Sequence, residues 1–228
     1  MEQGRIMIKK NDYAILVLSC DKYEPCWTPF FTLLDKYFIN HPKVYLVTET
    51  KKCPYCETIN VNSNIWSQRF LQALRKIESE HVLVMLDDFF IRDYVDVDRI
   101  DNIEFTDDII CYNFELEYRE PALRLREWDI QKNNQVYLNS CQPTLWDRKK
   151  LMQRLYCDLN PQEWELYQVD SSYIHFINNQ DFIIDIGYCH QPLEIGWGIT
   201  RGKLSKECKE FLEKEGLLDE IINHYPLL

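Results

Sequence analysis

The chain has 228 residues, of which 46% are hydrophobic, and a formal net charge of −11 at pH 7. This length suits one domain with a continuous apolar core, and the acidic excess repels nucleic acid, so we expect no nucleic-acid partner. The sequence contains neither a run of about 20 apolar residues that could span a bilayer nor a secretory signal, so we expect a cytoplasmic protein.

Strand and helix patterns alternate over residues 1–90. The first strand is a near-continuous apolar run, which is typical of a strand buried on both faces of a parallel sheet. The predicted elements, in chain order, are strand 13–19, a helix that begins at Thr28 and Pro29 and runs to Phe38, strand 43–48, a helix capped by Ser63 or Asn64 that runs from Trp66 to Ile77, and strand 82–86. This βαβαβ order predicts a parallel, three-layer nucleotide-binding half.

The second half of the chain, residues 91–228, is less regular. Strands are predicted at 109–114, 136–139 and 182–186, and helices at 145–156, 163–177 and 205–215, with Gly216 as the C-cap of the last helix. No repeat, low-complexity tract or linker divides the chain. We therefore predict a single α/β domain over residues 1–228 with a mainly parallel central sheet.

Two adjacent carboxylates, Asp87 and Asp88, directly follow the strand predicted at 82–86. Ligands of parallel sheets bind at the carboxyl ends of the strands, where Ser19 and Asp21 are also predicted to lie. A hard divalent cation that bridges to substrate phosphates would relieve the repulsion between the two acids, as is common for Mg²⁺. The alternative is that the pair forms a helix N-cap or a solvated turn.

The nine cysteines form no regular framework, and we expect most of them to be reduced core residues. Cys53-Pro-Tyr-Cys56 has the spacing of a thioredoxin-like dithiol. In that fold the second cysteine lies in a helix, whereas the residues after Cys56 are β-branched and Asn-rich and form helices poorly. A zinc site would need two further ligands, and no second pair of suitable spacing is present. Redox catalysis therefore stays an alternative function.

Glycine is scarce, since only six are present, which excludes a glycine-built phosphate loop such as the Walker motif. The 196–202 segment superficially resembles a dinucleotide loop, but too few residues follow it to form the next strand of a βαβ unit. Arg201 and Lys203 could fold back to neutralise a diphosphate, or they could be exposed surface charges.

A helix start is predicted at 160–165, with Glu163 and Glu165 at its positive end. The simpler role for these carboxylates is a favourable interaction with the helix dipole, worth about 0.3–1 kcal/mol. The alternative is that Glu165 is a general base.

Seven short segments, in this order along the chain, resemble GT-A-like glycosyltransferases found in bacterial capsular and surface-polysaccharide gene clusters. The resemblance spans about Ala14 to Gly202. The segments are Ser19-Cys-Asp-Lys-Tyr23, Trp27, Tyr45-Leu-Val-Thr48, Trp66-Ser-Gln-Arg-Phe70, Leu86-Asp-Asp-Phe-Phe90, Gln142-Pro-Thr-Leu-Trp146 and Trp164-Glu165.

The resemblance implies a nucleotide-sugar donor, with a UDP-sugar favoured, and places the acceptor and catalytic half in residues 91–228. It implies that Asp21 and Arg69 lie near the base or ribose, and that Asp87 and Asp88 lie near the ribose and a diphosphate bound to Mn²⁺ or Mg²⁺. Glu165 would deprotonate the acceptor hydroxyl, giving inversion. The donor and sugar pocket would also include Ser19, Trp66, Gln142, Trp146, Arg201 and Lys203.

The resemblance further implies a saccharide or lipid-linked acceptor, and with it contact with the inner face of the cytoplasmic membrane. In the family a second acid follows the Trp-Glu segment two residues on, where this chain has Tyr167, so Glu163, Glu165 and Asp170 are all candidates for the base. Two other functions remain open. One is a nucleotidyltransferase or nucleotide-sugar hydrolase, and the other is a non-catalytic scaffold in polysaccharide assembly.

Overall fold

The computed structural model describes residues 6–7, 12–116, 128–130, 138–155, 157–167, 172–178, 189–191, 194–196, 199–200 and 202–228. The described strands are β1 (Ile6–Met7), β2 (Tyr13–Leu18), β3 (Val44–Thr48), β4 (Glu57–Asn60), β5 (His81–Leu86), β6 (Glu104–Phe105), β7 (Ile109–Leu116), β8 (Trp128–Ile130), β9 (Thr144–Asp147), β10 (Ile174–Asn178), β11 (Cys189–Gln191), β12 (Glu194–Gly196), β13 (Ile199–Thr200) and β14 (Lys203–Leu204). The described helices are η1 (Asp21–Tyr23), α1 (Glu24–Tyr37), α2 (Trp66–Lys76), α3 (Val97–Asp101), α4 (Arg148–Met152), α5 (Pro161–Leu166), α6 (Lys206–Glu215) and η3 (Leu218–Glu220).

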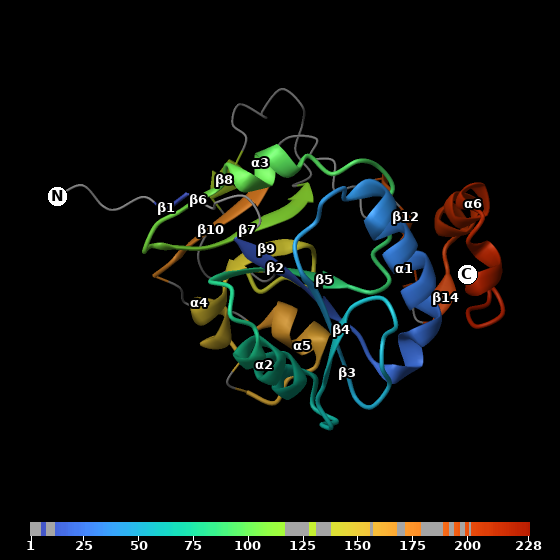
Figure 1. The fold of residues 1–228 in the computed structure, drawn as a ribbon, viewed down its shortest axis with the longest axis horizontal. Coiled ribbons are helices and arrows are strands. Elements are labelled where there is room, and N and C mark those ends of the chain that lie inside the picture. Colours follow the sequence, from blue (N-terminus) through green and yellow to red (C-terminus); the bar gives the residue numbers. More distant parts are fainter. Residues whose placement is uncertain are drawn as a thin grey trace.

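Eight strands form one mixed, mostly parallel sheet in the order β4-β3-β2-β5-β9-β7-β10-β8 (Figure 1). The β4, β3, β2 and β5 strands pair in parallel, as do β7 and β10. The β9 strand is antiparallel to both its neighbours, and β8 is antiparallel to β10. This arrangement confirms the predicted α/β class with its mainly parallel central sheet.

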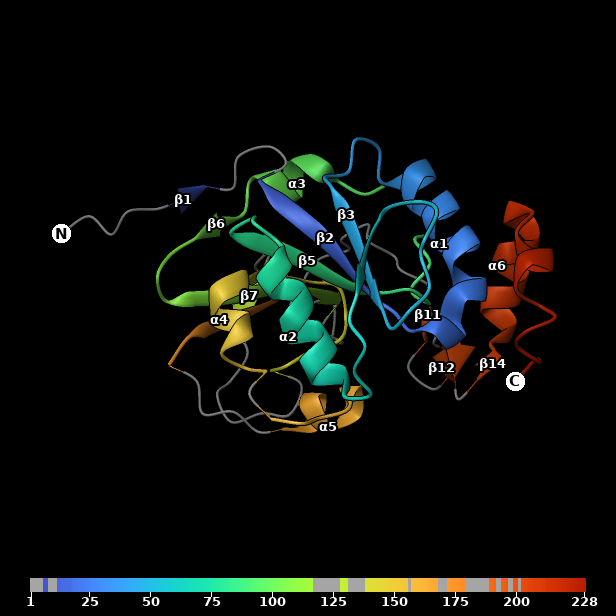
Figure 2. The same cartoon turned by 60° about the horizontal axis from the view of Figure 1, so that its bottom comes forward.

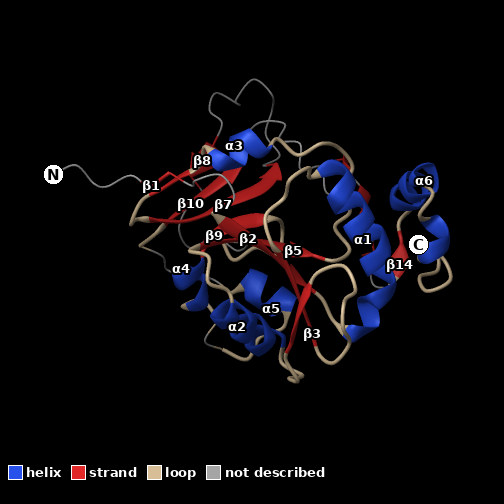
Figure 3. Cartoon of the chain, in the orientation of Figure 1, coloured by secondary structure: helices blue, strands red, loops and turns tan. Residues whose placement is uncertain are grey.

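Helices cover both faces of the sheet, so the domain has three layers (Figures 2 and 3). The reason is visible in β2, all of whose residues are buried. Ile15 faces a core that includes α1, α3 and α6, whereas its neighbour Leu16 faces a second core that includes α2, α4 and α5. An apolar run without alternation is therefore required, because both sides of this strand are covered.

The first helix begins earlier than predicted. The η1 turn runs directly into α1, which starts at Glu24 with Pro25 in its first turn, so Thr28 is not the N-cap and Pro29 lies inside the helix. The second helix begins where predicted, but its N-cap is Ile65 and not Ser63 or Asn64. The Ser63 hydroxyl instead accepts a hydrogen bond from the Ile65 backbone N–H at 3.2 Å, which bends the chain just before the helix.

The helix predicted at 145–156 is wrong in its first turn. Leu145 and Trp146 belong to β9, which pairs with β5 on one side and β7 on the other. Leu145 is buried in the first core and Trp146 in the second, which is the alternation of a strand. The helix α4 starts only at Arg148, where the Asp147 side chain caps it by accepting from the Lys150 N–H at 2.9 Å.

The helix predicted at 163–177 is also wrong in its second half. The α5 helix ends at Leu166, and Ile174–Asn178 forms β10, which pairs with β7 and β8. The β-branched and aromatic residues Ile174, Phe176 and Ile177 suit a strand better than a helix. The local start is as predicted, because Asn160 and Glu163 form a capping box.

Three further predictions have mixed outcomes. Leu138 and Asn139 are not in a strand, and the rest of the strand predicted at 136–139 lies outside the described residues, as does the strand predicted at 182–186. Gly216 is the C-cap of α6 in the left-handed conformation with φ of 72°, as predicted. The β4 strand at the sheet edge was not predicted.

Candidate functional site

The carboxyl ends of β2, β3 and β5 meet at one edge of the sheet. Leu18 pairs in register with Val47 of β3 and with Leu86 of β5, so the residues that follow these three positions lie level with one another. They are Ser19 and Asp21 after β2, Thr48 and Glu49 after Val47, and Asp87 and Asp88 after β5. The register thus gathers four carboxylates at the edge where ligands of parallel sheets bind.

Asp87 is buried and hydrogen-bonded. It is 4% exposed and accepts a hydrogen bond from the Ser19 hydroxyl, whose oxygen accepts in turn from the Trp27 indole N–H at 2.8 Å. Burial, and then the charge of Asp88, raise the pKa of Asp87 well above its usual value, and hydrogen bonds from Ser19 and Trp27 offset only part of this. Without a compensating cation, Asp87 therefore favours its protonated form.

Asp88 has fewer partners than Asp87. It is 8% exposed, and burial raises its pKa to about 7. Within the described residues no other side chain donates a hydrogen bond to it. Its own backbone N–H donates to the carboxylate and offsets only part of the effect of burial. A buried carboxylate with so few donors is costly when charged, so Asp88 suits a cation or a ligand hydroxyl.

A divalent cation fits this pair only if a ligand completes its coordination. The described residues contain no group of three or more His, Cys, Asp or Glu side chains arranged to hold a metal ion. Two carboxylates with raised pKa values still match the oxygen donors that Mg²⁺ uses, because Mg²⁺ commonly takes one or two protein carboxylates together with substrate phosphates and water. Asp87 and Asp88 are thus the residues that would hold such an ion.

Glu49 joins Asp21 to Arg69. The Glu49 carboxylate accepts from the Asp21 backbone N–H at 2.7 Å and pairs with the Arg69 guanidinium at 3.1 Å. Arg69 also donates to the Ser63 carbonyl at 2.7 Å, and its side chain is 11% exposed. Glu49 was not among the predicted site residues, although it links two of them.

Asp21 is held by the chain segment that follows β3. Its carboxylate accepts from the Thr48 hydroxyl at 2.7 Å and from the backbone N–H groups of Thr50 and Lys51, each at 3.0 Å. Partial burial raises the pKa of Asp21, but hydrogen bonds from Thr50, Lys51 and Thr48 outweigh it and hold the pKa well below its usual value. Asp21 is therefore a fixed anion that orders this loop.

Glu165, the predicted base, is half-buried at the end of α5, and its Oε1 accepts from the Cys141 backbone N–H at 2.8 Å. Burial raises the pKa of the Cys141 thiol, as do the nearby charges of Glu165 and Asp88. Both carboxylates thus lie close to Cys141. The alternative base Glu163 is exposed and bonds to the Asn160 N–H at 2.9 Å in the capping box, and Asp170 lies outside the described residues.

The other predicted pocket residues are more scattered. Trp66 is half-buried with its ring 5.5 Å from the Trp164 ring, whereas Trp146 is fully buried between Trp164 and His175 in the second core. Gln142 is 6% exposed in the turn before β9, and its carbonyl accepts from the Thr144 hydroxyl at 2.8 Å.

Of the two predicted diphosphate-binding cations, Arg201 lies outside the described residues. Lys203 is exposed on β14, and no ion pair within the described part of the chain joins it to Asp87 or Asp88.

Two tyrosines that were not predicted to be site residues lie near the Asp87–Asp88 pair, although Tyr23 belongs to the first segment of the family resemblance. The rings of Tyr23 and Tyr225 are 5.9 Å apart, and the Tyr225 hydroxyl donates to the Lys22 carbonyl at 3.4 Å. Burial, followed by the charges of Asp88 and Asp87, raises the pKa of Tyr23. The C-terminal segment thereby braces the turn that carries Asp21.

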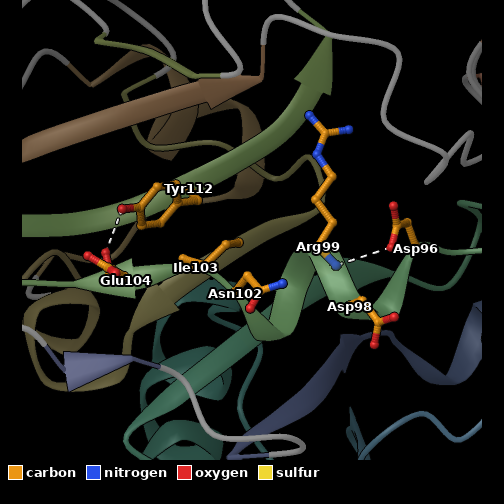
Figure 4. Close-up of a pocket in the computed structure, with 7 residues that line it drawn as sticks. All are labelled: Asp96, Asp98, Arg99, Asn102, Ile103, Glu104 and Tyr112. Carbon is orange, nitrogen blue, oxygen red and sulfur yellow. Dashed lines mark hydrogen bonds between the residues drawn. The ribbon is translucent and has the colours of Figure 1, made fainter.

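A pocket with a volume of about 490 Å³ lies away from these strand ends (Figure 4). Asp96, Asp98, Arg99, Asn102, Ile103, Glu104 and Tyr112 line it, from α3 and its flanks, β6 and β7. The Tyr112 hydroxyl donates to the Glu104 carbonyl at 2.6 Å. Three carboxylates against one guanidinium disfavour a diphosphate here, and none of the predicted site residues lines the pocket.

No protein-family model matches the chain, and no curated protein matches its sequence. Among solved structures, a nucleotidyl transferase from Methanothermobacter thermautotroptrophicus aligns with 77% of this chain and 90% of its own, at 9% identity and a TM-score of 0.51. The bifunctional IspDF from Campylobacter jejuni aligns with 74% of this chain at 14% identity and a TM-score of 0.44. A mannosyltransferase from Pyrobaculum calidifontis, in complex with GDP-Man and Mn²⁺, aligns with 78% at 8% identity and a TM-score of 0.44.

The chain spans 50% of the IspDF structure and 59% of the mannosyltransferase structure. At these identities the likeness concerns the fold, which is the α/β fold of GT-A-like and nucleotidyltransferase structures. The nucleotidyl transferase and the mannosyltransferase that share this chain's fold are both transferases. None of the described helices has the length and apolar character that crossing a bilayer requires.

Proposed function

We propose that the protein transfers a sugar, with inversion, from a nucleotide-sugar donor to a saccharide or lipid-linked acceptor in bacterial surface-polysaccharide synthesis. The donor favoured by the family resemblance is a UDP-sugar. The observation that carries this proposal is the meeting of Asp87 and Asp88 with the Asp21–Glu49–Arg69 network at one sheet edge, while Glu165 and Asp88 lie close to Cys141.

In this proposal the Asp21–Glu49–Arg69 network positions the nucleoside. Arg69 is a planar donor already oriented by Glu49 and the Ser63 carbonyl, so little side-chain entropy is lost when a ligand binds beside it. Asp88 accepts a ribose hydroxyl or holds the cation, because no other described side chain donates to it. A Mn²⁺ or Mg²⁺ ion bound at Asp87 and Asp88 would supply positive charge opposite the departing diphosphate.

Glu165 accepts the proton of the acceptor hydroxyl as that oxygen attacks the anomeric carbon. The Cys141 N–H holds Oε1 at 2.8 Å, which fixes the carboxylate. Asp170 and Glu163 remain alternative bases, although the Glu163 carboxylate is engaged in the capping box. A lipid-linked acceptor would bring this cytoplasmic protein to the inner face of the membrane.

Thermal melting with a panel of nucleoside diphosphates and nucleotide sugars, with and without Mn²⁺ or Mg²⁺, tests the donor site. A ligand at a hundredfold excess over its Kd stabilises the native state by about 2.7 kcal/mol. We expect a shift that is selective for one base and larger with metal, and we expect Asp88→Asn to lose the metal-dependent part. Equal binding by Asp88→Asn and the unaltered protein, with and without metal, would reject the donor site.

The second candidate function is nucleotidyl transfer, since the nucleotidyl transferase likeness covers 90% of that protein. Product analysis by mass spectrometry separates the two. Glycosyl transfer releases a nucleoside diphosphate and a glycosylated acceptor, whereas nucleotidyl transfer releases pyrophosphate and a nucleotide-linked product. If no nucleotide shifts the melting temperature, the non-catalytic scaffold becomes the better explanation.

A further inference from the structure

Cys53 and Cys56 lie together in the loop between β3 and β4, and both are free thiols. Only two residues separate them, so both thiols lie in one short turn, where the Cys56 thiol donates to the Glu57 carbonyl at 3.7 Å. Cys53 is 7% exposed, and Cys56 is more exposed. One turn of the loop therefore carries a buried thiol and a half-buried thiol.

The surroundings of this pair favour a thiolate. The hydrogen bond from Cys56 lowers the pKa of Cys53 to about 7, against the opposing effect of burial, and the backbone N–H groups of Tyr55 and Cys56 add to the lowering. The same hydrogen bond raises the pKa of Cys56. Thiolates, and not thiols, are the nucleophiles of disulfide exchange.

The pair does not have the geometry of a thioredoxin-like centre. Cys56 is followed by β4 and not by a helix, so no helix N-terminus stabilises a thiolate there. A zinc site is also unsupported, because the described residues hold no group of three metal-binding side chains. The remaining chemistry of two adjacent thiols is their own oxidation.

We propose that Cys53 and Cys56 are a reversible oxidation site that forms an intramolecular disulfide. A thiolate of the pair attacks a small-molecule disulfide such as oxidised glutathione, whose S–S bond breaks and releases one thiolate. The second sulfur of the pair loses its proton to water and attacks the mixed disulfide, which releases the other thiol. Two protein thiols are oxidised to one disulfide, and the reagent is reduced to two thiols.

The oxidation site is connected to the candidate donor site. The Cys53 N–H donates to the Thr58 hydroxyl at 2.8 Å, and the Lys51 carbonyl accepts from Asn60 at 2.7 Å, so β4 holds the loop at two points. The N–H groups of Thr50 and Lys51 hold Asp21. Both cysteines are free thiols, and an S–S bond of about 2.05 Å is shorter than any contact between two free thiols, so closure must shift this loop.

This connection, which rests on the proposed function, predicts that oxidation weakens donor binding severalfold. The disulfide itself does not depend on that function.

The experiment is a redox titration of the full chain in mixtures of reduced and oxidised glutathione at pH 7.5, followed by alkylation and peptide mass analysis. We expect the peptide with Cys53 and Cys56 to lose two hydrogen atoms, and a dithiol reductant to restore them. Cys20 and Cys157, which are comparably accessible but lack a neighbouring thiol, are the matched controls and should carry at most glutathione adducts. Cys53→Ser and Cys56→Ser should each trap a mixed disulfide on the remaining sulfur.

Separate glutathione adducts on Cys53 and Cys56, with no disulfide, would overturn the proposal, as would tight Zn²⁺ binding that blocks oxidation. Melting with the best nucleotide ligand, in the oxidised and reduced forms and in the Cys53→Ser/Cys56→Ser double variant, tests the connection. If the disulfide forms but the nucleotide raises the melting temperature by the same amount in both forms, only the connection to the donor site is refuted. A disulfide in a protein that no nucleotide stabilises refutes the proposed function and leaves the oxidation site standing.

Discussion

The Cys141 backbone N–H donates a 2.8 Å hydrogen bond to Oε1 of Glu165, which joins the turn before β9 to the end of α5. The two segments are 24 residues apart in the chain. The bond orients a half-buried carboxylate beside Cys141, whose thiol pKa the charge of Asp88 also raises. This position distinguishes Glu165 from Glu163, whose carboxylate bonds to the N-terminus of its own helix.

Glu165→Gln separates the chemical role of this residue from its structural role. The amide oxygen can still accept from Cys141, so the fold and nucleotide binding should be retained, while the group can no longer take a proton. We expect kcat to fall by about 10²–10⁴-fold with little change in KM for the donor. Steady-state kinetics with melting curves provide the measurement.

Glu163→Gln is the matched control, because glutamine keeps the capping box. Full activity in Glu165→Gln together with loss of activity in Glu163→Gln or Asp170→Asn would move the base to one of those residues.

The raised pKa of Asp88 predicts a pH-dependent stability. Its folded-state pKa is about 7, against an ordinary value of 3.8, so the folded state binds a proton that the unfolded state releases between these values. The stability from the protonated form is complete below pH 3.8 and is lost as pH rises through 7, by about 4 kcal/mol at most. Asp87 shifts in the same direction.

Urea unfolding at pH 4, 5.5 and 7 measures this effect in the unaltered protein and in Asp88→Asn. We expect the variant to become more stable relative to the unaltered protein as pH rises. Mn²⁺ or Mg²⁺ should narrow the difference at pH 7 and not at pH 4. A difference that does not vary with pH would mean that Asp88 is charged in the folded protein, contrary to its burial.

The strands of residues 1–90 could be predicted from sequence because the central ones are buried on both faces. A run such as Ile15-Leu16-Val17 sends neighbours to opposite cores, and few other elements require an apolar residue at every position. β9 could not be predicted in the same way. Leu145 and Trp146 pair with β5 and β7, which are distant in sequence, so the local sequence does not show this pairing and the helix was predicted to begin at Leu145.

The candidate site was predicted in part for a similar reason. Asp87 and Asp88 follow an obvious strand, so their place at its end could be inferred from the local sequence. Glu49 lies in an ordinary polar stretch of sequence. Its structural role comes from two contacts across the sheet edge, one with the Asp21 N–H and one with Arg69. Such contacts depend on the parallel register, which a single sequence does not encode locally.

Burial of His175 predicts that its imidazole stays neutral in the folded protein down to about pH 3. Burial, and then the charge of Arg154, lower the pKa of His175 to about 3, and its Nδ1 lies 3.4 Å from the Cys111 sulfur. The unfolded state takes up a proton near pH 6.5 that the folded state does not, so this contribution to stability is complete above pH 6.5 and is lost as pH falls towards 3. It opposes the effect of Asp88.

Imidazole NMR resonances test this directly. The His175 signals should not shift between pH 8 and 4.5. Titration of His175 near pH 6 would show that the second core admits water or a counter-ion at this position.

The bridge made by Glu49 predicts that the nucleoside site depends on a residue with no catalytic role. In Glu49→Gln the side chain can still accept from the Asp21 N–H, but the ion pair with Arg69 is lost. We expect the melting shift with the best nucleotide to shrink, corresponding to about a tenfold weaker Kd, while kcat at saturating donor changes less than twofold. Isothermal titration calorimetry measures the affinity and steady-state kinetics the turnover.

Lys43, directly before β3, and Glu57 of β4 form an exposed ion pair with side chains 60% and 55% exposed. Glu57→Gln is therefore the matched control and should leave affinity unchanged. Arg69→Met should reproduce the affinity loss of Glu49→Gln, and the double variant should lose little more, because the two side chains act through one contact. Additive losses would show that Glu49 and Arg69 meet the ligand independently, and unchanged affinity in both would place the nucleoside elsewhere.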